Sequence, residues 1–170
     1  TPVEIESDMS GVRPLLLKAL EDALRQFVAM REAEGEHLKA DFLARLKVLE
    51  EHVEAIAALG PEIVERYRER LQKTLAELLA ETEIDPARII QETAIYADKV
   101  NYTEEIVRLR SHFQQFRQIL AEAAEPVGRK LDFLIQEMNR EINTTASKAN
   151  STQATRTAVE VKSEIEKLRE

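Results

Sequence analysis

Hydrophobic residues recur every three or four positions along most of the chain, which is the spacing of α-helices. From residue 42 to 56 they step by 4, 3, 4 and 3, as in the seam of a coiled coil, and such a seam requires a partner helix. A comparable stripe follows Gly60-Pro61. We therefore predict that 11–80 forms a long antiparallel helical hairpin, with 36–59 packed on 61–80. The seam consists of Phe42, Leu46, Leu49, Val53 and Ile56, and the stripe of Val64, Tyr67, Leu71, Leu75 and Leu78.

Residues 81–170 predict a smaller helical bundle, because capping residues divide the pattern into shorter helices. Asp85-Pro86 pairs an N-cap residue with a proline in the first turn. Thr103 is a second candidate cap, and Pro126 opens a further helix. Small polar side chains make 147–152 the weakest helical stretch, so we expect a bend there. The predicted helices span 86–99, 104–121, 126–145 and the segment after 152.

The composition favours an all-α fold, because alanine and straight-chain residues are abundant and only 4 of the 170 residues are Gly. Residues 1–10 are polar and are predicted to form an arm. Since the first residue is Thr, we expect the chain to be part of a longer protein. No apolar run approaches the roughly 20 residues of a membrane span, and no signal peptide is recognisable, so we expect no membrane partner.

The chain has 24 Lys and Arg residues against 32 Asp and Glu residues, which gives a formal net charge of −8. No overall positive field would draw it to nucleic acid, so any such contact must be local. The absence of Cys excludes disulfides, thiolate metal ligands and cysteine nucleophiles, and it agrees with a reducing compartment.

A first group of candidate functional residues lies on the predicted helix 104–121. Glu105, Arg108 and His112 are spaced so that they share one helix face. A carboxylate and an imidazole in this arrangement can bind a divalent ion or exchange protons, while a guanidinium can hold an anionic oxygen. The same spacing more often belongs to a solvent-exposed helix face with salt bridges, and this alternative stays open here.

A second group lies on the predicted helix 126–145, opposite its apolar face. It is a polar stripe of amides and one carboxylate, with side chains that are costly to bury and weak at promoting solubility. The stripe therefore predicts hydrogen bonds to a ligand, a partner or another subunit, with a site and a subunit contact equally open. The stripe consists of Asp132, Gln136, Asn139 and Asn143, and Arg129, Glu137, Arg140 and Glu141 flank it.

The amino-acid sequences of these two regions resemble those of a known family. The strings ADKVNYTEEIVRLRSHFQQFRQIL, GRKLDFLIQEMNREINTTASKANS and VEVKSEIEKLRE are similar to the C-terminal part of the YicC/YloC family of bacterial proteins. Upstream, MREAEGEHLKADFLARL resembles the same family's long helical region, so the likeness covers nearly the whole chain. The resemblance implies a cytoplasmic, metal-dependent endoribonuclease that acts on single-stranded RNA as a homo-oligomer, with a hexamer expected. It also implies a strand-rich N-terminal region that this sequence lacks.

By position, the family's signatures fall on the two groups of residues described above. Asn101 stands where the family usually has Asp, which would remove one carboxylate from a metal shell. The acid and histidine motif falls on Glu104, Glu105, Arg108 and His112, and the helical signature on Gly128, Arg129, Asp132, Gln136, Glu137, Asn139, Arg140 and Glu141.

The leading hypothesis is hydrolysis of RNA at a divalent-ion site, with Mg²⁺ or Mn²⁺ preferred for an oxygen-rich shell. The alternatives are a non-catalytic helical oligomerisation scaffold and an RNA-binding adaptor. We expect no DNA partner, and we expect residues 1–170 alone to bind RNA poorly and to be inactive or weakly active. The predicted catalytic residues are Glu105, Arg108, His112 and Glu137; the metal ligands Glu105, His112, Asp132 and Glu137; and the substrate-binding residues Arg129, Gln136, Asn139 and Arg140.

Overall fold

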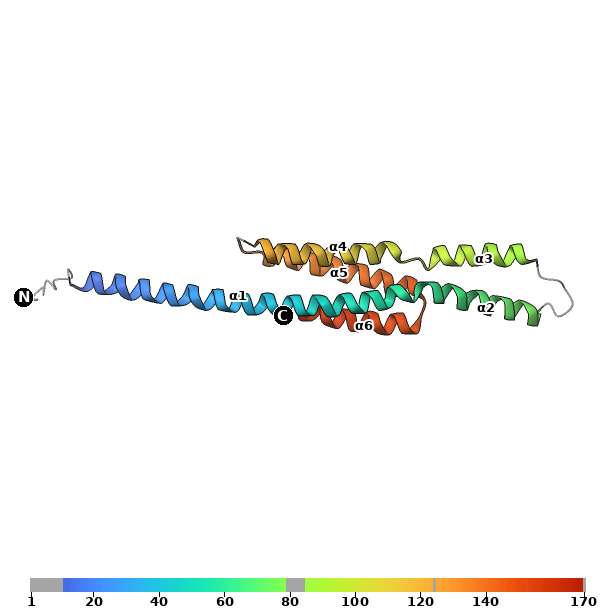
Figure 1. Cartoon of the computed structure of the whole chain (residues 1–170), viewed down its shortest axis with the longest axis horizontal. Helices are drawn as coiled ribbons and strands as arrows, with labels where there is room; N and C mark the ends of the chain where they lie inside the picture. The colour runs from blue at the N-terminus through green and yellow to red at the C-terminus, as the bar shows by residue number, and fades with distance from the viewer. Residues whose placement is uncertain (1–10, 79–84, 124, 170) are drawn as a thin grey trace, which may run out of the picture. The chain divides into compact units, whose positions relative to one another are not determined.

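The computed structural model describes residues 11–78, 85–123 and 125–169, and in these ranges the protein consists of six α-helices without a strand (Figure 1). This confirms the predicted all-α fold. The predicted polar arm, 1–10, lies outside the described residues. The helices are α1 (Val12–Ala58), α2 (Gly60–Leu78), α3 (Pro86–Lys99), α4 (Thr103–Glu122), α5 (Gly128–Ala149) and α6 (Thr152–Lys167).

The chain separates into two units, residues 1–41 and 42–170. The described part of the first unit is the first section of α1, and it exposes many large apolar side chains. The second unit contains the rest of α1 and the other five helices, together with the buried core. The division of the chain into 11–80 and 81–170 stays a prediction. The exposed apolar residues of the first unit include Leu15, Leu16, Leu20, Leu24 and Phe27.

In the second unit, α1 and α2 run antiparallel to α4 and α3. Tyr67 of α2 stacks on Tyr96 of α3, with ring centroids 3.7 Å apart and planes inclined by 8°. As the residue number rises along α1 and α2, the number of the partner residue on the other arm falls. A long antiparallel hairpin is therefore present. Its pairs include Glu50 with Arg117, Glu54 with Arg110, and Ile56 with Tyr102.

The turn of this hairpin lies in a different place from the one predicted. The pattern at Gly60-Pro61 predicts the end of a helix and a reversal of the chain, but no glycine has a positive φ among the described residues. Instead, Ile63 N donates to Leu59 O at 3.0 Å, so the helical path continues past Pro61 as a bend. The predicted packing of 61–80 on 36–59 is therefore wrong for the described residues of the second unit, 61–78 and 42–59. The helix α2 packs on α3 and runs antiparallel to it (Figure 1).

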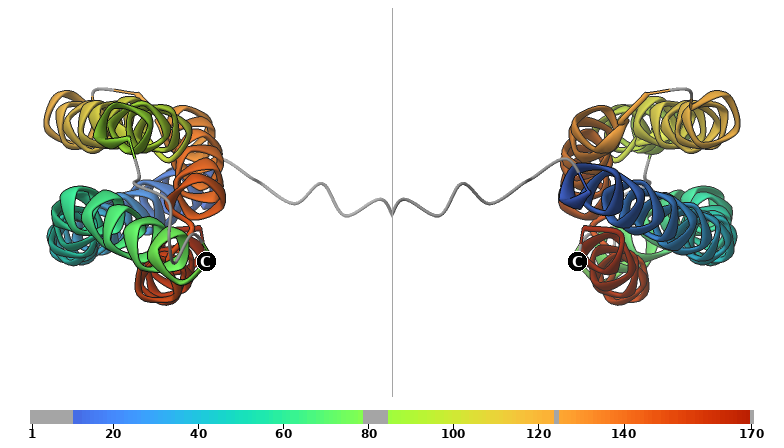
Figure 2. Two further views of the ribbon diagram at one scale, coloured as in Figure 1. Left: turned by 90° about the vertical axis from the view of Figure 1, so that its right-hand side faces the viewer. Right: turned by 90° about the vertical axis from the view of Figure 1, so that its left-hand side faces the viewer.

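The core of the second unit is a four-helix arrangement of α1, α4, α5 and α6. The helix α4 packs on α5, and α5 packs on α6 (Figure 2). Arg45 of α1 pairs with Glu164 of α6 at 3.6 Å, which closes the arrangement. The predicted coiled-coil seam is buried, except that Phe42 is only half-buried and packs edge-on against Phe116 of α4. The seam therefore has partner helices, but these are α4 and α6 and not the predicted 61–80.

Capping residues next to the helices explain several of the helix ends. The Asp85 side chain accepts the Ala87 N–H at 2.9 Å, which confirms the predicted cap of α3. The predicted cap by Thr103 is wrong, because Thr103 is the first residue of α4 and its N–H donates to Asn101 Oδ1 at 2.9 Å. The helix α5 continues past the predicted end at Thr145 to Ala149, which is fully buried, and ends at Asn150 with φ of 44°. Since α6 begins at Thr152, the predicted bend within 147–152 is confirmed.

Candidate metal centre between α4 and α5

Charged side chains of α4 and α5 meet along the contact between these two helices. They flank the apolar stripes that hold the helices together, so each lies at the edge of the core. Residues three, four or seven positions apart share a helix face, which explains why each helix presents its charges as a row. The row on α4 consists of Glu105, Arg108 and His112, and the row on α5 of Glu137, Glu141 and Lys148.

One imidazole and two carboxylates form a compact cluster, which we call the metal cluster. One ligand atom each of His112, Glu137 and Glu141 lies within 4.8 Å of the others, and no other such group of three occurs in the described residues. Glu141 is only 4% exposed. His112 Nδ1 is buried and has no hydrogen-bond partner within the described ranges. Because a buried polar atom without a partner is costly, the cluster is suited to hold a cation.

Arg108 borders the metal cluster. Its Nη1 donates to Glu141 Oε1 at 3.3 Å, and its Nη2 donates to Glu104. These partners raise the pKa of Arg108, first through the hydrogen bond to Glu141 and then through the charge of Glu104. Arg108 is therefore a permanent cation beside the cluster. Its side chain is 52% exposed, so its guanidinium is accessible to an anionic ligand.

Glu105 lies outside the metal cluster, in contrast to His112 on the same helix. The two residues are seven positions apart, which is about 10 Å along the axis of α4. Glu105 is buried, and its Oε1 accepts a hydrogen bond from Lys148 Nζ at 2.7 Å. Its Oε2 is buried without a partner in the described residues. Glu105 therefore connects α4 with the last turn of α5.

The structure brings together only part of the predicted metal shell. His112 and Glu137 meet, with Arg108 beside them through its contact with Glu141. The residue that completes the cluster is Glu141, which the sequence analysis placed beside the polar stripe and in the helical signature but not among the metal ligands. The spacing of Glu137 and Glu141, four positions apart on one helix face, is the signal that could have identified the pair.

The structure places Asp132 on a different side of α5. Asp132 and Glu141 are nine positions apart, or about two and a half turns, so they point in opposite directions. Asp132 accepts a hydrogen bond from Gln136 Nε2 at 2.9 Å and lies 3.7 Å from Arg169 Nε. The remaining predicted substrate-binding residues also lie outside the metal cluster. Arg129, Gln136 and Arg140 are exposed, and Asn139 is half-buried.

Known proteins resemble this chain over the region that contains the metal cluster. Residues 56–170 match the family described as "Endoribonuclease YicC-like, C-terminal". The chain is 46% identical over 168 residues to a protein of Clostridioides difficile (strain 630) named "Probable endoribonuclease YicC". It is 38% identical over 165 residues to a protein of the same name from Haemophilus influenzae (strain ATCC 51907 / DSM 11121 / KW20 / Rd).

These matches extend over nearly the whole chain but not over the whole of the relatives. They cover 98% of the chain and 57% of the first relative, and 97% of the chain and 56% of the second. Residues from Glu105 to Glu141 all fall inside the matched family region. The chain belongs to the YicC-like endoribonuclease family, and residues 56–170 correspond to the C-terminal region of that family.

Proposed function

We propose that this chain carries the metal-dependent active site of an endoribonuclease that cleaves single-stranded RNA. The observation that carries the proposal is the convergence of His112, Glu137 and Glu141 on one spot, in a member of an endoribonuclease family. Two carboxylates and an imidazole can hold a metal ion, and a bound metal ion can promote the hydrolysis of a phosphodiester. Because the chain spans little more than half of its relatives' length, the activity is proposed for the whole protein, meaning the polypeptide as the cell makes it.

The metal cluster fits a divalent cation. His112, Glu137 and Glu141 would hold the ion, and the unpartnered Nδ1 of His112 supports this assignment. The predominance of oxygen ligands favours Mg²⁺ or Mn²⁺, and the single imidazole is more compatible with Mn²⁺. When bound, such an ion activates water as a nucleophile and offsets negative charge on the phosphate.

The residues around the cluster supply binding and proton transfer. Glu137 is half-buried and makes no hydrogen bond in the described residues, so its carboxylate can accept a proton from an attacking water. Arg108 would hold a phosphate oxygen, because its charge is fixed by Glu141 and Glu104. Glu105 acts as a positioning residue that fixes Lys148 beside the path of the substrate.

The predicted substrate contacts on α5 keep a role in this proposal. Arg129 and Arg140 are exposed cations that can contact phosphates next to the scissile bond. Gln136 and Asn139 can donate hydrogen bonds to ribose or base edges. Asp132 holds Gln136 and pairs with Arg169, so we assign it a positioning role.

The same proposal includes assembly as a homo-oligomer, with a hexamer expected, in the cytoplasm. The exposed apolar side chains of the first unit support assembly, because large apolar patches on a protein surface usually mark an interface. The absence of Cys is compatible with a reducing compartment. None of the described helices is both long and apolar enough to cross a membrane.

Cleavage assays on the whole protein test the proposal. The variants His112→Ala, Glu137→Gln and Glu141→Gln should each lose about 100-fold or more of the Mn²⁺-dependent cleavage of an unstructured RNA. His37→Ala and Glu166→Gln are matched controls, because both residues are exposed and lie outside the cluster. Circular dichroism and sedimentation should be unchanged in all five. Full cleavage by the three cluster variants would contradict the proposal.

A non-catalytic scaffold or RNA-binding adaptor is the second candidate function. The exposed apolar side chains on the first unit favour it, because they suit assembly and take no part in the metal cluster. A scaffold predicts cleavage that disappears when the wild-type protein is purified rigorously while its oligomeric mass persists. The nuclease proposal predicts cleavage that follows the protein through every step.

A further inference from the structure

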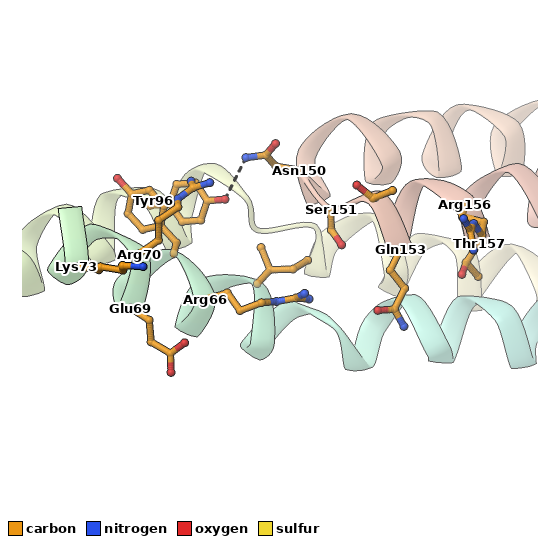
Figure 3. Close-up of a pocket in the computed structure, with 13 residues that line it drawn as sticks. Arg66, Glu69, Arg70, Lys73, Tyr96, Asn150, Ser151, Gln153, Arg156 and Thr157 are labelled. Atoms are coloured by element: carbon orange, nitrogen blue, oxygen red, sulfur yellow. Dashed lines mark hydrogen bonds between the residues drawn. The ribbon is translucent and has the colours of Figure 1, made fainter.

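A second candidate site lies at the opposite end of α5 from its N-terminus, where α2, α3 and the start of α6 enclose a groove of about 1060 Å³ (Figure 3). We call it the basic groove. Four cationic side chains and only one carboxylate, Glu69, line it, although the chain carries a net charge of −8. Positive charge is thus concentrated locally, as a contact with nucleic acid requires. The cations are Arg66, Arg70 and Lys73 of α2 and Arg156 of α6.

These cations are largely available to a ligand. Lys73 and Arg156 have no ion-pair partner among the described residues, and Arg70 lies over the Tyr67 ring with its Cζ 5.8 Å from the centroid. Arg66 contacts Glu62 on its own helix at 3.4 Å, in a pair that is about half exposed. Exposed pairs of this kind contribute little energy, so a phosphate can compete for the guanidinium.

Neutral donors complete the groove. Ser151 caps α6 and places the N-terminal end of this helix at the groove, where backbone N–H groups and the helix dipole favour an anion. Asn150 Nδ2 donates to the Tyr96 hydroxyl at 3.1 Å, which fixes the turn between α5 and α6 against the stacked tyrosines. The groove therefore combines cations of α2 and α6 with the backbone N–H groups at the start of α6.

The size and chemistry of the groove favour an extended polyanion. Sites for small molecules usually enclose about 300 to 1,000 Å³ and are mostly apolar. The basic groove lies at the upper end of this range, but it is open and lined mainly by charged and polar side chains. Single-stranded nucleic acid is bound by such positively charged grooves that follow its backbone, often with aromatic rings alongside.

The basic groove is also connected to the metal cluster by α5. Glu141 and Asn150 are nine positions apart, which is about 14 Å along the helix axis and about half a turn around it. Lys148 lies between them, and its seven-residue spacing from Glu141 places both on one side of α5. Because nine positions are two and a half turns, a strand that leaves the groove has to pass around α5 to reach the cluster, and Lys148 lies on the side of the cluster.

We propose that the basic groove binds the sugar-phosphate backbone of single-stranded RNA on one side of the scissile bond. This inference rests on the proposed function, which supplies RNA as the ligand. It also provides a local basic path on the chain itself, which the net charge did not predict. Binding in the groove would hold the strand, and the metal cluster would act on the neighbouring linkage.

Binding measured without cleavage tests this inference. The probe is a fluorescent, unstructured RNA of about 20 nucleotides, bound to the whole protein in excess EDTA and followed by anisotropy between about 50 and 200 mM salt. The groove variant is Arg70→Gln/Lys73→Gln/Arg156→Gln. The matched control, Lys18→Gln/Lys47→Gln/Lys162→Gln, changes the net charge equally at exposed positions outside the groove and the cluster.

The groove variant should bind about tenfold more weakly or worse, while the control binds like the wild type. The slope of log affinity against log salt should fall by about 2 in magnitude, because each phosphate of a single strand that a cation neutralises accounts for about 0.7 of the slope. Equal affinities and slopes for the groove variant and the control would overturn the inference. So would a groove variant that changes the sedimentation mass but not the RNA affinity, because the groove would then hold another copy of the chain.

Glu141→Gln separates this inference from the proposed function. It should bind RNA in EDTA like the wild type and should lose cleavage in Mn²⁺. If Glu141→Gln cleaves normally but the groove variant binds weakly, the assignment of the metal cluster fails and the basic groove stands. If the groove variant binds normally but Glu141→Gln does not cleave, the groove inference fails alone. Circular dichroism spectra identical to the wild type would exclude misfolding in each case.

Discussion

Lys148 Nζ lies 2.7 Å from Oε1 of Glu105, and the two partners differ sharply in their exposure. The side chain of Glu105 is 7% exposed and that of Lys148 is 37% exposed. Removing the lysine would leave a buried carboxylate without a counter-charge, whereas removing the carboxylate would leave an ammonium that can reach water. The pair therefore has an asymmetric effect on stability.

Lys148→Met should destabilise the protein by about 2 kcal/mol, measured by urea unfolding, because it leaves the buried Glu105 carboxylate without a counter-charge. Glu105→Gln should destabilise it less, since an amide oxygen still accepts from Lys148. Adding Glu105→Gln to Lys148→Met should recover part of the loss. Lys167→Met is the control, because it breaks a surface pair with Glu164. Equal losses in Lys148→Met and Lys167→Met would refute the asymmetry.

Tyr102 stabilises the bend between α1 and α2. Its hydroxyl donates to Ile56 O at 2.9 Å, beside the point where Pro61 lacks a donor. Burial raises the pKa of Tyr102, so the hydroxyl remains a donor into the alkaline range. Tyr102→Phe should reduce the free energy of unfolding by about 1 kcal/mol, because a buried hydrogen bond is lost.

Tyr67→Phe is the matched control for this change, because the Tyr67 hydroxyl makes no hydrogen bond in the described residues while its ring stacks on Tyr96. Chemical denaturation of both variants measures the difference. If Tyr102→Phe is as stable as Tyr67→Phe, the hydrogen bond to Ile56 does not support the bend.

The ion pair of Glu54 and Arg110 makes stability depend on pH. The Arg110 guanidinium donates to both oxygens of Glu54, at 2.7 and 2.6 Å, and this hydrogen bonding lowers the pKa of Glu54. A carboxyl whose pKa is lower in the folded state adds stability above its unfolded pKa and loses it as the pH falls through the folded value. The stabilisation is therefore complete at neutral pH and disappears in acid.

Glu54→Gln should be less stable than the wild type at neutral pH by up to about 1 kcal/mol, since both partners are about half exposed. The difference should shrink as the pH falls below the ordinary range of a carboxyl group, and high salt should also reduce it. Unfolding midpoints across pH measure this trend. Glu51→Gln, an exposed residue of α1 without an ion pair in the described residues, should show no such trend. A difference that stays constant into acid would disprove the linkage.

Sequence reasoning predicted the features that depend on neighbouring residues. Asp85-Pro86 begins α3 because a cap and a proline act within one turn. At Gly60-Pro61 the predicted boundary between two helices is confirmed, but the predicted reversal is wrong, because the same dipeptide suits either a reversal or a bend and the packing of Tyr102 and α3 decides between them. The seam from Phe42 to Ile56 correctly indicated a partner helix, but it contains no information about which helix that is.

The candidate site could likewise be predicted from the sequence only within each helix. Spacing alone places His112 with Arg108 on one helix and Glu137 with Glu141 on another, but the register between α4 and α5 depends on packing. The polar stripe was visible, yet the sequence could not show that Asp132 faces Arg169 and not α4. The basic groove was unpredictable for a similar reason, because Arg70 and Arg156 are far apart in the chain and only the fold brings them together.

The contrast between Glu141 and Asp132 gives the most direct test of the metal cluster. Glu141 lies within 4.8 Å of the ligand atoms of His112 and Glu137, whereas Asp132 faces away from them, toward Arg169. Glu141→Gln should therefore weaken Mn²⁺ binding to the whole protein by about tenfold or more, because an amide is a poorer ligand than a carboxylate. Asp132→Asn should leave the affinity nearly unchanged, because it removes only a surface ion pair. Electron paramagnetic resonance of free Mn²⁺ at fixed pH measures both values. Equal weakening by the two substitutions would contradict the assignment of the ion to the metal cluster, because Asp132 faces away from it.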